Sequence, residues 1–449
     1  MAKPKASGTK KTKTKTKSKS GAKRTAGKKA AGSKKSSTRK KSTTQKKAGK
    51  AAKKKTAAKK KTVGRKKQAA AKKNTASQKS KSRGTSAASK RSQAKTQSGG
   101  TAAKKRGKTA DGAPAKRPAR GRSRIKMLPR DFMIDLASAI RDAVTPAVKA
   151  AKGREIIGQA TSGDVTFELD LIAEKALLAF LKQARMPVAY YSEDEGYATF
   201  TGTQPENLLI VDPVDGTRAA KSGFEGSVVA VASTRVIERP RMADVDSGCV
   251  MEILGDRVFY AERGKGARYY MNGRTKRPRL SQNVDLETLS WSMTVPARPA
   301  ELIFPTAARL IDLTSFKGAF FACNSTSFSL TRMLTNQLDA CVDFANRYLR
   351  DIPDLVQDHF INAGRGVTLG IAPYDLAASL LIATEAGCTV TDAYGDDFDD
   401  VLLLDSGDAN HRSLIAASNA KLHAKLMSFF DTRINQFELL LKRRASRAD

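Results

Sequence analysis

The chain has 449 residues and a formal net charge of +40, from 83 Lys and Arg against 43 Asp and Glu. No apolar run approaches the roughly 18 residues of a membrane span, and the N-terminus lacks the apolar core of a secretory signal. The 4 cysteines are widely spaced and none of the 3 histidines lies in a metal-ligand motif, which argues against a disulfide framework and against zinc chemistry. We therefore expect a cytoplasmic protein.

Residues 1–126 are predicted to form a disordered polycationic tail. They hold about 47 of the basic residues and one acidic residue, Asp111, so the remaining body carries a net charge of about −6. Without aromatic side chains, the tail cannot offset the entropy of ordering its backbone. Its composition resembles the Lys/Ala-rich tails of linker histones and bacterial histone-like proteins. We expect sequence-independent nucleic-acid binding through counterion release, and association with the nucleoid; other polyanions and a mere solubilising role are the alternatives.

Residues 127–449 are predicted to form one catalytic domain of mixed helices and strands. Hydrophobic periodicity, turn residues and caps indicate the elements. We expect Glu168 and Glu174 to lie on a solvent-exposed helix face, although Glu174 matches a position of the family that the acidic segments resemble. The predicted elements are helices at 129–152, 170–183, 326–336 and 373–386, a strand at 226–237, a hairpin of 249–254 with 257–261, a strand at 414–417, and a last helix capped by Ser418 that runs to about residue 444.

The segment Asp212-Pro213-Val214-Asp215-Gly216-Thr217 is the most informative stretch. It follows the apolar run 208–211, which predicts a buried strand ending at Asp212. Two carboxylates three positions apart suit hard cations such as Mg²⁺, which prefer oxygen ligands. A helix starting at Gly216 would point free amides at an anion. The alternative interpretation is a strand, a proline turn and an aspartate cap.

Three further acidic segments, at 163–174, 192–196 and 373–379, occur along the chain with that motif. In this order and spacing the four segments resemble the inositol monophosphatase family, whose superfamily includes fructose-1,6-bisphosphatases and 3′-phosphoadenosine nucleotide phosphatases. The resemblance covers about residues 128–449. It implies a layered α/β/α/β/α sandwich of the α+β type and a phosphoric monoester hydrolase that uses two to three Mg²⁺ ions, or Mn²⁺.

The resemblance also implies which residues bind metal. Glu193, Asp212 and the carbonyl of Val214 would hold one Mg²⁺. A second ion would be held by Asp212, Asp215 and Asp375, with Asp212 bridging the two ions.

Catalytic and substrate-binding roles follow from the same resemblance. Asp170 would accept a hydrogen bond from the Thr217 hydroxyl, and Thr217 with Glu193 would orient the attacking water. The amides of Gly216 and Thr217 would hold the phosphate, and Asp375 would contact the substrate.

The substrate is less well defined, because the chain departs from the family pattern after Thr217 and at Tyr374, and residues 350–372 cannot be aligned with it. We expect a small sugar or polyol phosphate, of the inositol-1-phosphate or fructose-1,6-bisphosphate type. A nucleotide 3′-phosphatase is the alternative enzyme, and a nucleoid-associated DNA-binding protein on a phosphatase-like scaffold is the alternative class. Retention of the four carboxylates favours an enzyme, because a cluster of like charges is costly to keep. A homodimer is one candidate assembly.

Overall fold

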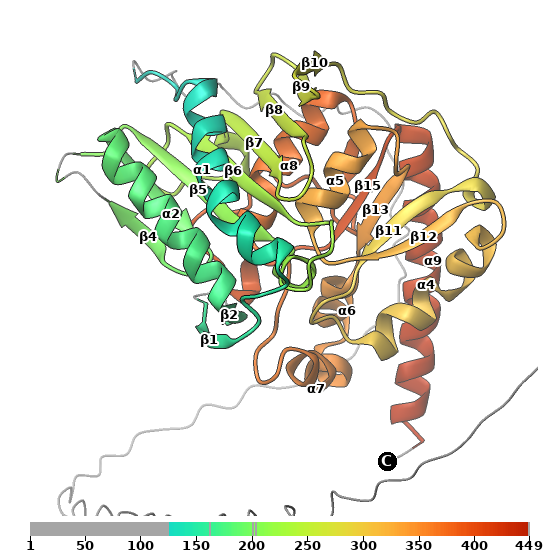
Figure 1. Ribbon diagram of the computed structural model, residues 1–449. Coiled ribbons are helices and arrows are strands. Elements are labelled where there is room, and N and C mark those ends of the chain that lie inside the picture. The colour runs from blue at the N-terminus through green and yellow to red at the C-terminus, as the bar shows by residue number, and fades with distance from the viewer. Residues whose placement is uncertain (1–124, 161–162, 200–201, 203, 448–449) are drawn as a thin grey trace, which may run out of the picture. The chain divides into compact units, whose positions relative to one another are not determined.

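The computed structural model describes residues 125–160, 163–199, 202 and 204–447. The predicted tail therefore lies outside the described residues except for its last two. The described part is built in five layers of helices and sheets (Figure 1). This confirms the predicted α/β/α/β/α sandwich.

The first sheet has eight strands in the order β10-β9-β8-β7-β6-β5-β3-β4. Its neighbouring strands are antiparallel, except that β3 and β5 run parallel. Because β3 and β5 are parallel neighbours, the residues that follow them leave the same edge of the sheet. The strands are β3 (Val188–Ser192), β4 (Gly196–Thr199), β5 (Asn207–Asp215), β6 (Val228–Thr234), β7 (Ser247–Glu252), β8 (Val258–Glu262), β9 (Ala267–Met271) and β10 (Arg274–Lys276).

The second sheet has five strands in the order β12-β11-β13-β15-β14, and a separate hairpin is formed by β1 and β2. In the second sheet β11 pairs in parallel with β12 and β13, and β15 is antiparallel to β13 and β14. The strands are β1 (Ile156–Gln159), β2 (Val165–Phe167), β11 (Ser290–Thr294), β12 (Ala319–Cys323), β13 (Ala340–Asp343), β14 (Thr389–Thr391) and β15 (Leu414–Ala417).

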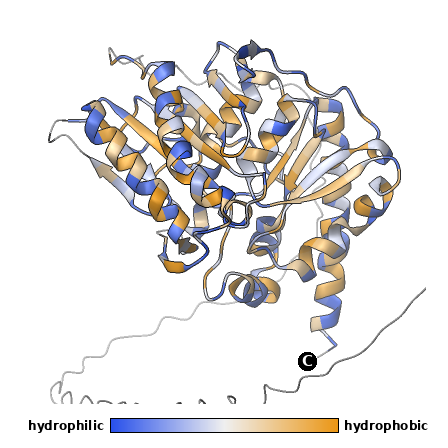
Figure 2. Cartoon of the chain, in the orientation of Figure 1, coloured by the Kyte–Doolittle hydropathy of each residue, from blue (hydrophilic) through white to orange (hydrophobic). Residues whose placement is uncertain are grey.

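Helices cover both outer faces and fill the space between the sheets. Helices α1 (Arg130–Lys149) and α2 (Glu168–Ala184) pack on the eight-stranded sheet, α5 (Thr326–Leu334) and α8 (Pro373–Ala386) lie between the sheets, and α4 (Ala300–Thr314) and α9 (Ala420–Ala445) cover the five-stranded sheet. In Figure 2, α1 and α2 carry hydrophobic and hydrophilic stripes, as expected of helices with one face on a core. The shorter helices are α3 (Thr217–Ala220), α6 (Ala345–Asp351) and α7 (Pro353–Ala363), with single turns η1 (Met242–Asp244), η2 (Leu286–Thr288) and η3 (Asp408–Asn410).

Helix α8 is the central element of the core. It is buried on all sides from Pro373 to Ala383 apart from Asp375, which is only partly buried. A helix that is apolar all round suits a position between two sheets. Gly387 ends it in the left-handed conformation, with φ of 99°. The packing of α8 against both sheets therefore fixes where Asp375, in its first turn, is placed.

Strand β5 continues beyond the predicted end at Asp212. It runs to Asp215, with Asp212 opposite Ala230 and Asp215 opposite Val228 of β6. One more residue therefore lies between the two aspartates on β5 than between their partners, which is a β-bulge. Residues three apart in a regular strand point to opposite faces, but the extra residue turns both carboxylates to one side. The buried strand is present as predicted, but its predicted end was wrong because a bulge leaves no signal in hydrophobic alternation.

Two local predictions were also wrong. The cap of α9 is Asn419, whose side chain accepts a hydrogen bond from the Leu422 amide, whereas the Ser418 hydroxyl donates to the Asp339 carbonyl at 2.9 Å. Ser418 lies just after β15, and its amide also donates to the Asp339 carbonyl before β13, so Ser418 belongs to the strand pairing and not to the helix cap. Glu174 is 3% exposed and does not face solvent, because its face of α2 turns toward the sheet; Glu168 is exposed as expected. The other predicted elements agree with the structure to within a few residues at their ends.

Candidate active site

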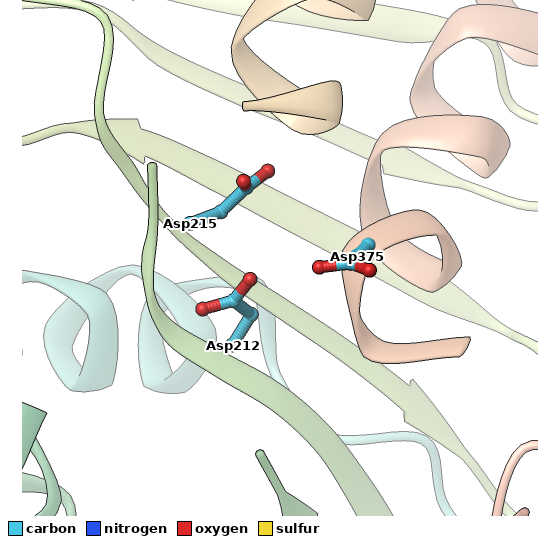
Figure 3. A group of neighbouring side chains, drawn as sticks. All are labelled: Asp212, Asp215 and Asp375. Carbon is cyan, nitrogen blue, oxygen red and sulfur yellow. The ribbon is translucent and has the colours of Figure 1, made fainter. Parts of the chain in front are cut away.

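Three carboxylates converge where β5 meets the start of α8. One oxygen from each of Asp212, Asp215 and Asp375 lies within 4.8 Å of the other two. Figure 3 shows the side chains of the two β5 residues and of the α8 residue directed toward a common space. Residues that are 160 positions apart are thus brought together by the β5 bulge and by the packing of α8.

The electrostatics of this group call for a cation. Burial, followed by the charges of Asp215 and Glu193, holds the pKa of Asp212 well above its usual range. Burial and the charge of Asp215 raise the pKa of Asp375 to about 8. Largely buried carboxyls that face each other cannot all ionise without a compensating charge. An all-oxygen donor set of this kind fits a hard divalent cation such as Mg²⁺.

Asp215 is held by the first turn of α5. It accepts a hydrogen bond from the Ser327 amide at 2.8 Å. Burial raises the pKa of Asp215 to about 6, and hydrogen bonds from Ser325 and Ser327 oppose that rise. Unpaired amides at a helix start favour a negative charge. Asp215 is therefore oriented and kept ionised more readily than Asp375.

Glu193 follows the last residue of β3 and lies outside the compact group of three. It nevertheless lines the same pocket as Asp215 and Asp375. Burial and the charge of Asp375 hold the pKa of Glu193 well above its usual range. The parallel pairing of β3 with β5 explains this placement, because both strands deliver their carboxylates to one edge of the sheet.

Thr217 begins α3 and connects two predicted site residues. Its hydroxyl donates to the Val214 carbonyl at 2.9 Å and also lies within hydrogen-bonding reach of Asp170. A hydroxyl carries one proton, so it can donate to only one of these acceptors at a time. Burial raises the pKa of Asp170 to about 7, although hydrogen bonds from the Phe167 amide and Thr217 oppose the rise. Asp170 and Val214 are thus the two alternative acceptors of the Thr217 hydroxyl.

Gly216 is required by the local backbone. Its φ is +93°, and a Cβ there would lie 2.8 Å from the Gly226 carbonyl oxygen. Few side chains tolerate that conformation, and none fits that space. Glycine at this position therefore lets β5 turn directly into α3, which places Thr217 beside the aspartates.

Other residues of the pocket were missed by sequence reasoning. Arg218, seen only as a departure from the family pattern, forms an ion pair with Asp164 at 2.8 Å that joins the β1–β2 segment to α3. Arg298 pairs with buried Asp343 at 2.7 Å, and His411 follows η3. No sequence signal marked Arg298 or His411, because each lies in a loop outside any motif. The empty space of the pocket, open mouth included, is about 560 Å³.

The chain belongs to the inositol monophosphatase family, whose model matches residues 130–434. This family places the chain among the phosphoric monoester hydrolases. It is 27% identical over 300 residues to a fructose-1,6-bisphosphatase/inositol-1-monophosphatase of Methanothermobacter thermautotrophicus, covering 66% of this chain and 93% of that protein. It is 26% identical over 313 residues to a bifunctional NADP phosphatase/NAD kinase of Methanococcus maripaludis, covering 68% of this chain and 49% of that protein.

Among solved structures, the Thermotoga maritima IMPase is similar with a TM-score of 0.48 and 20% identity, covering 68% of this chain and 98% of that one. Among the described residues, no helix has the length and apolar character that crossing a bilayer requires.

Proposed function

We propose that residues 127–449 are a Mg²⁺-dependent phosphomonoesterase that hydrolyses a small sugar or polyol phosphate. The observation that carries this proposal is the convergence of Asp212, Asp215 and Asp375, since Asp215 and Asp375 also line a pocket with Glu193. The names of two relatives, fructose-1,6-bisphosphatase/inositol-1-monophosphatase and the inositol monophosphatase 1 of Bos taurus, support this substrate class.

In this proposal Glu193, Asp212 and the Val214 carbonyl hold one Mg²⁺, and Asp212, Asp215 and Asp375 hold a second. Mn²⁺ is an alternative, and a third ion is compatible with the acidic surroundings. When bound, these cations supply Lewis acidity, which lowers the pKa of water and offsets charge on the phosphate. The chain's contribution is to fix the ligands on β5, β3 and α8, so that little reorganisation is needed.

The residues beside the carboxylates position the reactants. If the Val214 carbonyl served as a metal ligand, the Thr217 hydroxyl would donate its proton to Asp170 and would keep a lone pair for a water molecule. Glu193 holds the other side of that water as acceptor. The amides of Gly216 and Thr217 face the phosphate, and Asp375 contacts the substrate next to it. The phosphate is thereby held in line between the water and the leaving oxygen.

A nucleotide phosphatase is the second candidate function. It is favoured by the similarity to a protein named an NADP phosphatase/NAD kinase, of which this chain spans about half the length. A phosphate-release screen separates the candidates, using inositol 1-phosphate, fructose 1,6-bisphosphate, NADP and adenosine 3′-phosphate with Mg²⁺. We expect the highest kcat/KM with a sugar or polyol phosphate. Release from none of these compounds would overturn the phosphatase proposal.

We further propose that the tail binds nucleic acid independently of the domain, and that this places the protein at the nucleoid. Residues 1–126 carry about 47 basic residues and the rest of the chain is acidic overall. Neutralised phosphates release counterions, so binding should weaken steeply with salt. The full chain should shift unrelated DNA duplexes equally at low salt in a mobility-shift assay, and the chain without residues 1–126 should shift none.

Turnover should not depend on the tail. Since the tail is expected to act as a flexible tether, its removal should change kcat/KM on a small substrate by less than about twofold. Steady-state kinetics on the full and shortened chains provide the measurement. Tight DNA binding by the shortened chain, or loss of its turnover, would contradict this division of roles.

A further inference from the structure

His411 carries a buried hydrogen-bond acceptor that has no partner in the described part of the chain. The side chain is 1% exposed and lines the pocket that holds Asp215 and Asp375. Its ring donates a hydrogen bond to the Ser406 carbonyl, whereas its Nδ1 atom has no hydrogen-bond partner. With the proton on the other ring nitrogen, Nδ1 presents a lone pair. A buried acceptor of this kind is expected to meet a donor.

No neighbouring side chain among the described residues supplies that donor. The carboxylate of Asp408 has its Oδ1 at 3.9 Å from Nδ1, and an ionised carboxylate can only accept. Burial lowers the pKa of His411, and the charge of Arg298 lowers it further against the opposing effect of Asp408. The ring is therefore neutral near pH 7, and its Nδ1 is an acceptor facing another acceptor.

Arg298 supplies unused donors at the same end of the pocket. Its Nε and Nη2 donate to Asp343 at 2.9 and 2.7 Å, and its Nη1 donates to the Pro296 carbonyl at 3.1 Å. Arginine has five N–H groups, so two remain. It lines the same pocket as Asp375 and His411, and its charge acts on both groups. The buried pairing with Asp343 makes this guanidinium rigid.

Gly370 keeps the position of the imidazole open. A Cβ on Gly370 would lie 2.5 Å from Cγ and 2.6 Å from Nδ1 of His411. Gly370 itself lines the pocket. The ring thus lies against bare backbone, and any side chain at residue 370 would displace it.

We propose that His411 and Arg298 form a binding subsite for a hydroxyl group of the substrate's leaving group. The hydroxyl donates its proton to Nδ1 of His411 and accepts an N–H of Arg298. Only a group that both donates and accepts satisfies the pair, which selects a phosphomonoester of a polyhydroxy alcohol over one of a plain alkyl or aryl alcohol. This inference rests on the proposed phosphatase function and assigns its preference for polyhydroxy substrates to two particular residues.

The test compares two probe substrates in the full chain with Mg²⁺. myo-Inositol 1-phosphate carries hydroxyls around its ring, and cyclohexyl phosphate has the same ring without them. We expect the wild type to prefer the first in kcat/KM. His411→Leu should reduce this preference by about tenfold or more, mainly through KM, because a site built for a hydroxyl loses its acceptor. His411→Asn places an amide oxygen near the position of Nδ1 and should retain much of the preference.

Two further variants guard against a purely structural effect. Gly370→Ala should displace the imidazole and reduce the preference in the same direction, which keeps the test valid if the leucine variant fails to fold. His359→Leu, on partly exposed α7 and outside this pocket, is the matched control and should keep the preference. Equal losses on both substrates in His411→Leu, or no wild-type preference, would overturn the hydroxyl subsite while leaving a phosphatase. Absence of phosphate release from both substrates would overturn the phosphatase function and the subsite together.

Discussion

Replacing Asp212 by asparagine is expected to lower kcat at least about 10³-fold, because both proposed cation sites lose a ligand oxygen and its charge. Asp212 is 1% exposed, so water cannot easily replace the lost ligand oxygen. Asparagine keeps the shape of the side chain, and the fold should survive. The measurement is steady-state turnover with saturating Mg²⁺, together with the melting temperature.

A matched control is Asp392→Asn. Asp392 is also buried, and its Oδ1 accepts hydrogen bonds from the Tyr394 and Asp396 amides, which an asparagine oxygen can also accept. This variant should keep turnover. By contrast, Thr217→Ala should slow turnover severely while metal binding remains, because Thr217 offers a hydroxyl and not a charge. Near wild-type turnover of Asp212→Asn would show that the metal assignment is wrong.

Removing divalent cations should abolish turnover altogether. The three carboxylates that lie within 4.8 Å of one another repel each other when ionised, and the phosphate of a substrate adds further negative charge. We expect no phosphate release in EDTA and recovery on addition of Mg²⁺ or Mn²⁺. Full turnover in the chelator would exclude the proposed mechanism.

The same site should make the effect of Mg²⁺ on stability depend on pH. The carboxyl pKa values in the folded, metal-free chain, about 6 for Asp215 and about 8 for Asp375, lie above the ordinary value of 3.8. The folded chain therefore holds more protons than the unfolded chain between these limits. The stabilisation of the folded, metal-free chain by protons on Asp215 and Asp375 is complete below about pH 4. It is lost as the pH rises through 6 to 8, where these two carboxyls ionise.

Cations and protons compete for these carboxylates, so Mg²⁺ should raise the urea midpoint more at pH 8.5 than at pH 6. Urea unfolding with EDTA or Mg²⁺ at the two pH values gives the comparison. Asp375→Asn should reduce the difference. An equal Mg²⁺ effect at both pH values would contradict a site made of these carboxyls.

Several properties of this protein were determined by the sequence alone. The charge division near residue 126 and the acidic segments around Asp170, Glu193, Asp212 and Asp375 required no coordinates. They led to the family and to the layered sandwich, and the structure confirms the sandwich in its described part. Local sequence also indicated most helices and strands, because hydrophobic periodicity and glycine stops such as Gly387 act over a few residues.

The tertiary structure decided what depends on contacts between distant residues. The bulge that turns Asp212 and Asp215 to one side depends on pairing with β6, and the cap at Asn419 depends on where β15 ends. The burial of Glu174 follows from how α2 lies on its neighbours. His411 and Arg298 entered the pocket only through the packing of loops more than one hundred residues apart. No local pattern encodes such contacts, because their energy comes from surfaces that meet only after the chain has folded.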